Sequence, residues 1–127
     1  YEMREDDIMK AIMTEVGSRT GVKLFRNNIG MSRDSYRRYG IPGPGGSDLI
    51  GWVTLEFGGQ QISIFCAIEV KSPGAVTRHD LLKKQEKFLA SVQNSGGIAG
   101  FADSVEAANK LIDDYLAFKM ARSISSS

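Results

Sequence analysis

Residues 47–71 read SDLIGWVTLEFGGQQISIFCAIEVK, and this stretch decides how the rest of the chain must be arranged. Two runs rich in β-branched and aromatic residues, 49–57 and 60–70, meet at Gly58-Gly59. Such a dipeptide supplies the positive φ angles that a two-residue hairpin turn requires. The stretch therefore predicts a β-hairpin centred between the two glycines.

Two acidic residues occupy matching places in this hairpin. Asp48 lies ten residues before the turn and Glu69 ten residues after it, so an unbulged register places them opposite each other on one face, with Cβ atoms about 5 Å apart. Lys71 shares that face because side chains alternate along a strand. Opposed carboxylates destabilise a sheet, and a cation such as Mg²⁺, which takes one or two carboxylates with waters and substrate phosphate, would offset the repulsion. The alternative is a solvated end of the hairpin in which Glu69 pairs with Lys71 and has no function.

The composition indicates one ordinary folded domain. The chain has 127 residues, 42% hydrophobic and 24% charged, with a net charge of +1, which is enough for a sizeable core but does not by itself indicate a nucleic-acid binder. We expect a single domain over 1–122 and a flexible tail over 123–127. No apolar run approaches the roughly 18 residues of a membrane span, and no signal-peptide pattern is present. The single Cys66 excludes an internal disulfide and fits a reducing compartment, so we expect a cytoplasmic protein without a membrane partner.

Hydrophobic periodicity and turn residues predict an α/β protein with a mixed sheet. Thr77 or its neighbour is expected to cap the helix that follows the hairpin. The hairpin strand 60–70 is apolar on both faces, which is typical of a central strand. A hairpin followed by a strand–helix–strand crossover predicts helices on the faces of the sheet. The remaining predicted elements are a helix over 3–17, a strand over 22–28, an irregular region over 29–46, a helix over about 78–94, a strand over 98–101 and a helix from 105 to about 120.

Two polar residues stand among the apolar stripes of the predicted helices. Glu15 lies seven residues after Ile8 and three after Ile12, so it is expected on the buried face. A carboxylate that points inward is costly unless it is paired or bound to a metal; the alternative is that Glu15 lies at the edge of the stripe and reaches water. Gln85 is the one polar member of the inward stripe of the helix at 78–94.

A basic stretch follows the first helix. Between Arg19 and Arg38, six basic residues accompany one acid, Asp34, and tyrosines lie among them. Basic and aromatic side chains together suit contacts to a phosphate backbone and to bases or sugars; the alternative is a solvated basic loop. The glycine-rich segment 43–46 lacks the Gly-Lys-Ser/Thr ending of a phosphate-binding loop, so no nucleotide cofactor is expected. The candidate DNA contacts are Arg26, Arg33, Tyr36, Arg37, Arg38 and, on the later helix, Lys83.

These polar residues also form a recognisable pattern. Glu15, the run Gly46-Ser47-Asp48-Leu49, the run Ile68-Glu69-Val70-Lys71 and Gln85 together resemble the PD-(D/E)XK nuclease superfamily and, more narrowly, the VRR-NUC (virus-type replication-repair nuclease) domain. The resemblance covers about residues 5–116. Ser47 stands where the superfamily name has proline, a difference that affects only the backbone.

The resemblance implies an αβββαβ restriction-endonuclease-like core, here followed by a C-terminal helix, that hydrolyses DNA phosphodiesters with Mg²⁺ or Mn²⁺. Stand-alone members are similar to homodimeric Holliday-junction resolvases, which implies branched DNA as substrate, a homodimer, a role in DNA repair and a bacterial or phage source. A non-catalytic DNA-binding module on the same fold, or a flap or nicking nuclease, are the alternatives. The implied residue roles are metal binding by Asp48, Glu69, the backbone carbonyl of Val70 and Glu15, positioning of the attacking water by Lys71, and orientation of Lys71 or the phosphate by Gln85.

Overall fold

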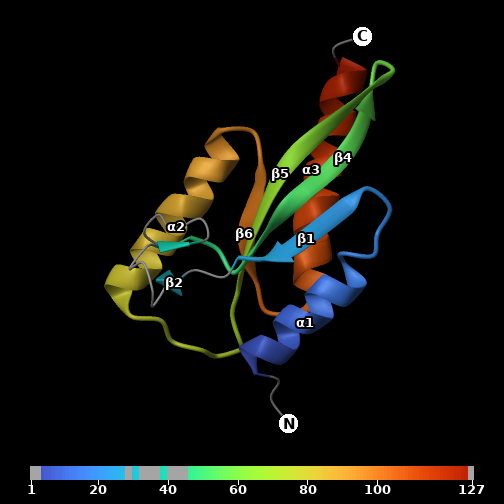
Figure 1. Cartoon of the computed structure of the whole chain (residues 1–127). Helices are drawn as coiled ribbons and strands as arrows, with labels where there is room; N and C mark the ends of the chain where they lie inside the picture. The colour runs from blue at the N-terminus through green and yellow to red at the C-terminus, as the bar shows by residue number, and fades with distance from the viewer. Residues whose placement is uncertain (1–3, 28–29, 32–37, 40–45, 126–127) are drawn as a thin grey trace.

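The protein is a four-stranded sheet with helices on both faces (Figure 1). The computed structural model describes residues 4–27, 30–31, 38–39 and 46–125. Its elements are α1 (Glu5–Glu15), β1 (Val22–Arg26), β2 (Gly30–Met31), β3 (Arg38–Tyr39), β4 (Leu49–Phe57), β5 (Gln60–Val70), α2 (His79–Asn94), β6 (Ile98–Ala102) and α3 (Val105–Ser125). No helix within these ranges is long and apolar enough to span a membrane.

The β4–β5 hairpin has the predicted strands and register. Leu49 lies opposite Ile68, and Phe57 lies opposite Gln60. Gly58 and Gly59 adopt φ angles of 59° and 80°, the left-handed region that favours glycine. A bulge-free ladder therefore runs from the turn to Leu49, which is the last paired residue of β4 on this side.

The other strands complete a mixed sheet in the order β1-β4-β5-β6. β1 is antiparallel to β4, and β6 is parallel to β5. Parallel neighbours need a crossover connection, which α2 provides. The predicted αβββαβ core with a C-terminal helix is confirmed.

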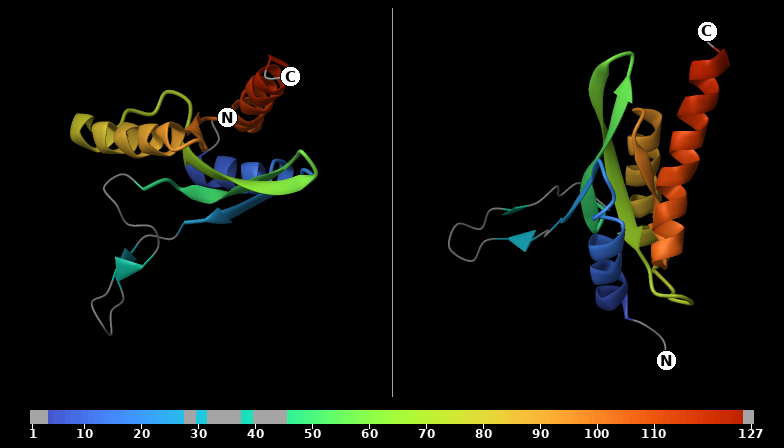
Figure 2. Two further views of the ribbon diagram at one scale, coloured as in Figure 1. Left: turned by 90° about the horizontal axis from the view of Figure 1, so that it is seen from above. Right: turned by 90° about the vertical axis from the view of Figure 1, so that its right-hand side faces the viewer.

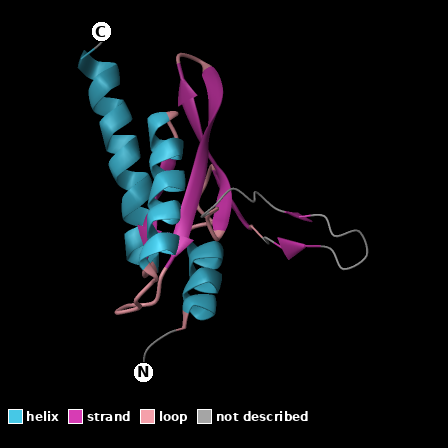
Figure 3. Cartoon of the chain, turned by 90° about the vertical axis from the view of Figure 1, so that its left-hand side faces the viewer, coloured by secondary structure: helices cyan, strands magenta, loops and turns pink. Residues whose placement is uncertain are grey.

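The two faces of the sheet are covered differently (Figures 2 and 3). One face packs against α1 and α3 around fully buried side chains such as Ile12, Ile68 and Ile112. On the other face, α2 packs on β5 and β6 through a smaller cluster of Ala67, Leu89, Val92 and Ala99. Helix α2 therefore leaves the β1 and β4 half of its face uncovered.

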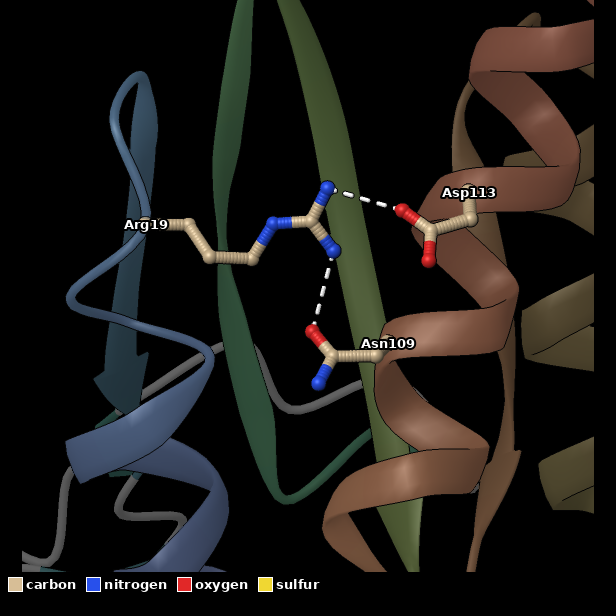
Figure 4. Close-up of polar contacts among 3 residues, drawn as sticks. All are labelled: Arg19, Asn109 and Asp113. Carbon is tan, nitrogen blue, oxygen red and sulfur yellow. Dashed lines mark hydrogen bonds and ion pairs between the residues drawn. The ribbon is translucent and has the colours of Figure 1, made fainter.

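Arg19 links the start of the chain to α3 (Figure 4). It lies between α1 and β1 and donates hydrogen bonds to Asn109 Oδ1 at 2.9 Å and to Asp113 Oδ1 at 2.8 Å. Arg19, one residue of the predicted basic stretch, therefore stabilises the packing of α3 in the described structure.

Three features differ from the sequence-based expectation. β2 and β3 pair within the region 29–46 that was expected to be irregular, with Gly30 opposite Tyr39; the intervening residues lie outside the described ranges. Helix α3 continues to Ser125, beyond the expected end near residue 120, because no glycine or proline interrupts it. The first half of β5 was expected to be buried on both faces, yet Ile62 and Phe65 are 40% and 41% exposed. Phe65 lies on the face of α2 but is not covered by it, and Ile62 lies on the opposite face near the turn, at the edge of the core.

Candidate active site

A cavity of about 740 Å³ lies where β4 begins and β5 ends. Its lining includes Asp48, Glu69, Lys71 and Gln85. The structure therefore brings together four of the five predicted catalytic residues, which come from the hairpin and α2. The remaining wall is formed by the first residues of α1 and by the segment 72–78 that leads into α2.

Asp48 is held by backbone contacts on both sides. Its Oδ2 accepts a hydrogen bond from the Val70 amide at 2.9 Å, and its carbonyl accepts one from the Asn27 amide at 2.8 Å. Asn27 also donates from Nδ2 to the carbonyl of Ser47 at 3.0 Å, and Ser47 donates from Oγ to the carbonyl of Leu49 at 3.1 Å. Asp48 and Glu69 thus line one cavity and lie one position beyond Leu49 and Ile68, the last pair of the ladder.

A chain of hydrogen bonds joins Lys71 to Glu69. Lys71 Nζ donates to Gln85 Oε1 at 2.9 Å, and Gln85 Nε2 donates to Glu69 Oε1 at 3.0 Å. Gln85 is buried although it is polar, because both ends of its amide are satisfied. The structure adds Thr77, whose Oγ1 accepts a second hydrogen bond from Lys71 at 2.9 Å. Thr77 was expected to cap α2, but no side chain caps the start of α2. The Thr77 hydroxyl accepts a hydrogen bond from Lys71 instead.

Glu69 is the least satisfied polar group of the site. The residue is 5% exposed, and its Oε2 is buried with no hydrogen-bond partner among the described residues. Burial, and then the charge of Asp48, raise the pKa of Glu69 to about 8, against the opposing effect of Lys71. Without a cation, this carboxyl group therefore holds its proton at neutral pH.

Glu15 does not reach the cavity. It is exposed at the last turn of α1, whereas Glu5 and Asp6 at the first turn line the cavity. The prediction of a buried Glu15 is wrong because Met9 is buried as well, which centres the core-facing stripe about 70° away from Glu15 around the helix axis and leaves Glu15 at its edge. Glu5 precedes Ile8 by three residues and Ile12 by seven, a spacing that could have indicated its position, but the acids of the first turn were explained by the helix dipole alone.

The donor set fits a hard divalent cation that is completed by water and substrate. Within the described ranges, no group of three or more His, Cys, Asp or Glu side chains is arranged to hold a metal by itself. Asp48 and the unsatisfied Oε2 of Glu69 nevertheless supply two carboxylates on one cavity wall. Mg²⁺ commonly binds through one or two carboxylates plus waters and phosphate oxygens, so these residues are compatible with such an ion.

Neither the cysteine nor the histidine of the chain, which often act in covalent catalysis, lines this cavity. Cys66 is buried in the core on the opposite face of β5, and burial raises the pKa of its thiol to about 12. A thiol in that state is inert. His79, the one histidine of the chain, is exposed at the start of α2 and does not line the cavity.

The predicted DNA contacts are placed only in part. Arg26 pairs with Asp6 at 3.0 Å, with both side chains about half exposed, and Lys83 is exposed on α2. Arg38 belongs to β3, while Arg33, Tyr36 and Arg37 lie outside the described residues.

Comparison with known proteins agrees with this geometry. No curated protein and no solved structure gives a significant match to the chain. Residues 12–106 of the 127 match the VRR-NUC domain, a nuclease domain of the PD-(D/E)XK superfamily that acts on DNA. With Asp48, Glu69, Lys71 and Gln85 gathered in one cavity of an αβββαβ core, the chain belongs to the VRR-NUC domain family.

Proposed function

We propose that this protein is a divalent-metal-dependent endonuclease that hydrolyses DNA phosphodiesters, with branched DNA such as a Holliday junction as its preferred substrate. The observation that carries the proposal is the unsatisfied Oε2 of Glu69, buried beside Asp48 in the cavity. A buried polar oxygen without a hydrogen-bond partner is costly, and binding of a cation would complete it.

The residues divide into those that hold the ion and those that act on the phosphate. Asp48 and Glu69 would hold Mg²⁺ or Mn²⁺, with the Val70 carbonyl as a further ligand. Glu5, rather than Glu15, would complete this set from α1 through a metal-bound water. When bound, the cation lowers the pKa of the attacking water and neutralises the charge that develops on the phosphate.

Lys71 provides the positive charge that the protein itself brings to the reaction. Gln85 and Thr77 hold its ammonium group at 2.9 Å each, which fixes the direction in which the charge is presented. A preorganised cation next to the phosphate stabilises the transition state more than a mobile one does. Gln85 therefore acts as a positioning residue that couples Lys71 to Glu69.

The preference for branched DNA and a homodimeric state are further parts of the proposal. They are supported by the resemblance to VRR-NUC proteins that are similar to homodimeric Holliday-junction resolvases. Two cuts at symmetric strands need two sites related by a dyad, which a C2 dimer supplies.

Cleavage of labelled DNA tests the proposal. The purified protein would be incubated with a four-way junction, a flap and a linear duplex in Mg²⁺, Mn²⁺ or EDTA. We expect metal-dependent cleavage of the junction above that of the linear duplex, and loss of at least 100-fold in rate for Glu69→Gln and Asp48→Asn, because each removes a ligand charge.

The outcomes separate the proposal from its alternatives. Cleavage that favours flaps or nicks one strand would assign a flap or nicking nuclease on the same site. Metal-independent DNA binding with no cleavage of any substrate would leave a non-catalytic module. Wild-type activity in Asp48→Asn would refute the assignment of the site.

A further inference from the structure

We infer that the uncovered half of the α2 face is a binding surface for unpaired bases of the substrate DNA, formed by Phe25, Trp52 and Phe65. This inference rests on the proposed nuclease function, because it concerns the path of the DNA next to the cavity.

The strand register places this aromatic surface directly beside the cavity. Phe25 lies opposite Ile50 on β4, which in turn lies opposite Ala67. Trp52, two residues further along β4, lies opposite Lys23 on one side and Phe65 on the other. Asp48 and Glu69 are each two residues from Ile50 and Ala67 in the other direction and on the same face. Successive rows are therefore about 7 Å apart, and the row of Trp52 is about 13 Å from Asp48.

The aromatic side chains are exposed in spite of their size. Phe25, Trp52 and Phe65 are 49%, 40% and 41% exposed. The rings of Phe25 and Trp52 contact each other with centroids 5.5 Å apart and tilted by 45°. Helix α2 packs on β5 and β6 and leaves these rings open. Contiguous exposed apolar surface of this kind marks a binding site.

Unpaired bases suit this surface better than duplex DNA or a protein partner does. Aromatic side chains on an open sheet face stack with bases whose π-faces are free, whereas the bases of a duplex are already stacked on each other. Lys23 stands in the same row as Trp52 and is exposed. An exposed lysine in this row suits a phosphate backbone, while lysine is depleted at the centre of protein–protein interfaces. The aromatic surface also adjoins the cavity proposed for phosphodiester hydrolysis, which favours DNA as its ligand.

Trp52 provides a direct measurement, because it is the one tryptophan of the chain. Its fluorescence would be followed in EDTA during titration with a thymidine oligonucleotide of 12 residues and, separately, with a blunt hairpin duplex of equal phosphate number. We expect quenching and a blue or red shift with the single strand, and little change with the duplex at the same concentration.

Matched variants identify the side chains that bind. Phe25→Ala and Phe65→Ala should each weaken single-strand affinity about tenfold, as expected for loss of one stacking partner. Phe118→Ala removes a phenylalanine that is 56% exposed on α3, on the other face of the sheet, and should leave the affinity unchanged. Melting temperatures within a few degrees of wild type would show that the variants are folded.

Three results would overturn the inference: equal quenching by the duplex, unchanged affinity in both Phe25→Ala and Phe65→Ala, or a Trp52 signal that depends on protein concentration and not on DNA. The last would show that a second copy of the chain covers this face. Cleavage assays distinguish this failure from that of the proposed function. A protein that cleaves duplex DNA with metal but does not bind the single strand keeps its nuclease assignment, whereas single-strand binding without cleavage supports the base-binding surface and refutes the nuclease.

Discussion

Gln85 donates a hydrogen bond from Nε2 to Oε1 of Glu69 at 3.0 Å, and this contact leaves the second oxygen of the same carboxylate buried without a partner among the described residues. The arrangement is asymmetric: one oxygen is fixed by the protein, and the other is available to a ligand. Because the group is also deeply buried beside Asp48, its protonation should control both stability and metal binding.

The first prediction concerns stability as a function of pH in EDTA. The pKa of Glu69 is raised from 4.5 to about 8 in the folded protein, so between these values the folded state keeps a proton that the unfolded state has lost. The contribution of this group is present below pH 4.5 and falls as pH rises, by about 1.4 kcal/mol per unit, until it levels off above pH 8. Glu69→Gln should therefore melt at a higher temperature than wild type at pH 8 and at nearly the same temperature at pH 4.5. A difference in calorimetric melting temperature that does not grow across this window would contradict the assignment.

Metal affinity should change with pH in the opposite sense. A metal ligand must be deprotonated, so Mn²⁺ has to displace the proton of Glu69 below pH 8. We expect the affinity, measured by isothermal titration calorimetry, to rise by up to tenfold per unit between pH 6 and 8 and then to level off. The heat should also depend on the ionisation enthalpy of the buffer, since a proton is released. An affinity that is flat with pH would show that Glu69 is not a ligand.

The third prediction compares two glutamates of α1. Glu5 lines the cavity, and Glu15 is exposed ten residues later, about 15 Å along the helix. Glu5→Gln should reduce the single-turnover cleavage rate at least tenfold, whereas Glu15→Gln should stay within about twofold of wild type. These two variants carry the same chemical change, so a larger effect at Glu15 would mean that the sequence-based assignment was correct and the structural one wrong.

A fourth prediction tests the coupling of Lys71 to Glu69 through Gln85. Gln85→Leu keeps the approximate volume but removes both hydrogen bonds of the bridge. We expect kcat to fall by about 100-fold with a small change in DNA affinity, because the ammonium group is no longer held in place. Thr77→Val removes only one acceptor of Lys71 and should cost less. Equal losses in binding and in kcat for Gln85→Leu would indicate a general disruption of the cavity instead.

The last prediction concerns the close approach of β1 and β4. A Cβ at Gly51 would collide with the backbone oxygen of Lys23, so Gly51→Ala must move a central strand and should cost about 3 kcal/mol or more. Gly58→Asn is the control: nothing lies within 4 Å of a Cβ at Gly58, whose φ is 59°, and asparagine tolerates that conformation. Urea denaturation should show a large loss of stability for the first variant and less than about 1 kcal/mol for the second.

Much of the fold and of the candidate site follows from local sequence signals. The Gly58-Gly59 turn sets the register of the hairpin because a two-residue turn leaves no freedom in the pairing, and that register placed Asp48 and Glu69 at one end. Gln85 was identified because a polar residue in an apolar helical stripe needs a partner. Its partners, Glu69 and Lys71, became visible only when α2 was placed on β5.

The sequence by itself determined the strands of the hairpin, the order of the main elements and the residue types of the site, since these depend on turns and periodicity within short segments. Only the tertiary structure decided that Glu5 and not Glu15 faces the cavity. It also decided that Thr77 accepts a hydrogen bond from Lys71 instead of capping a helix. The exposure of Phe25, Trp52 and Phe65 was likewise not predicted from the sequence. Each of these depends on how far one element covers another. The burial of Met9 moves the centre of the buried stripe of α1 away from Glu15, and α2 packs on two strands of the sheet rather than on four. Such packing is a non-local balance of contacts, and periodicity within one segment does not determine it.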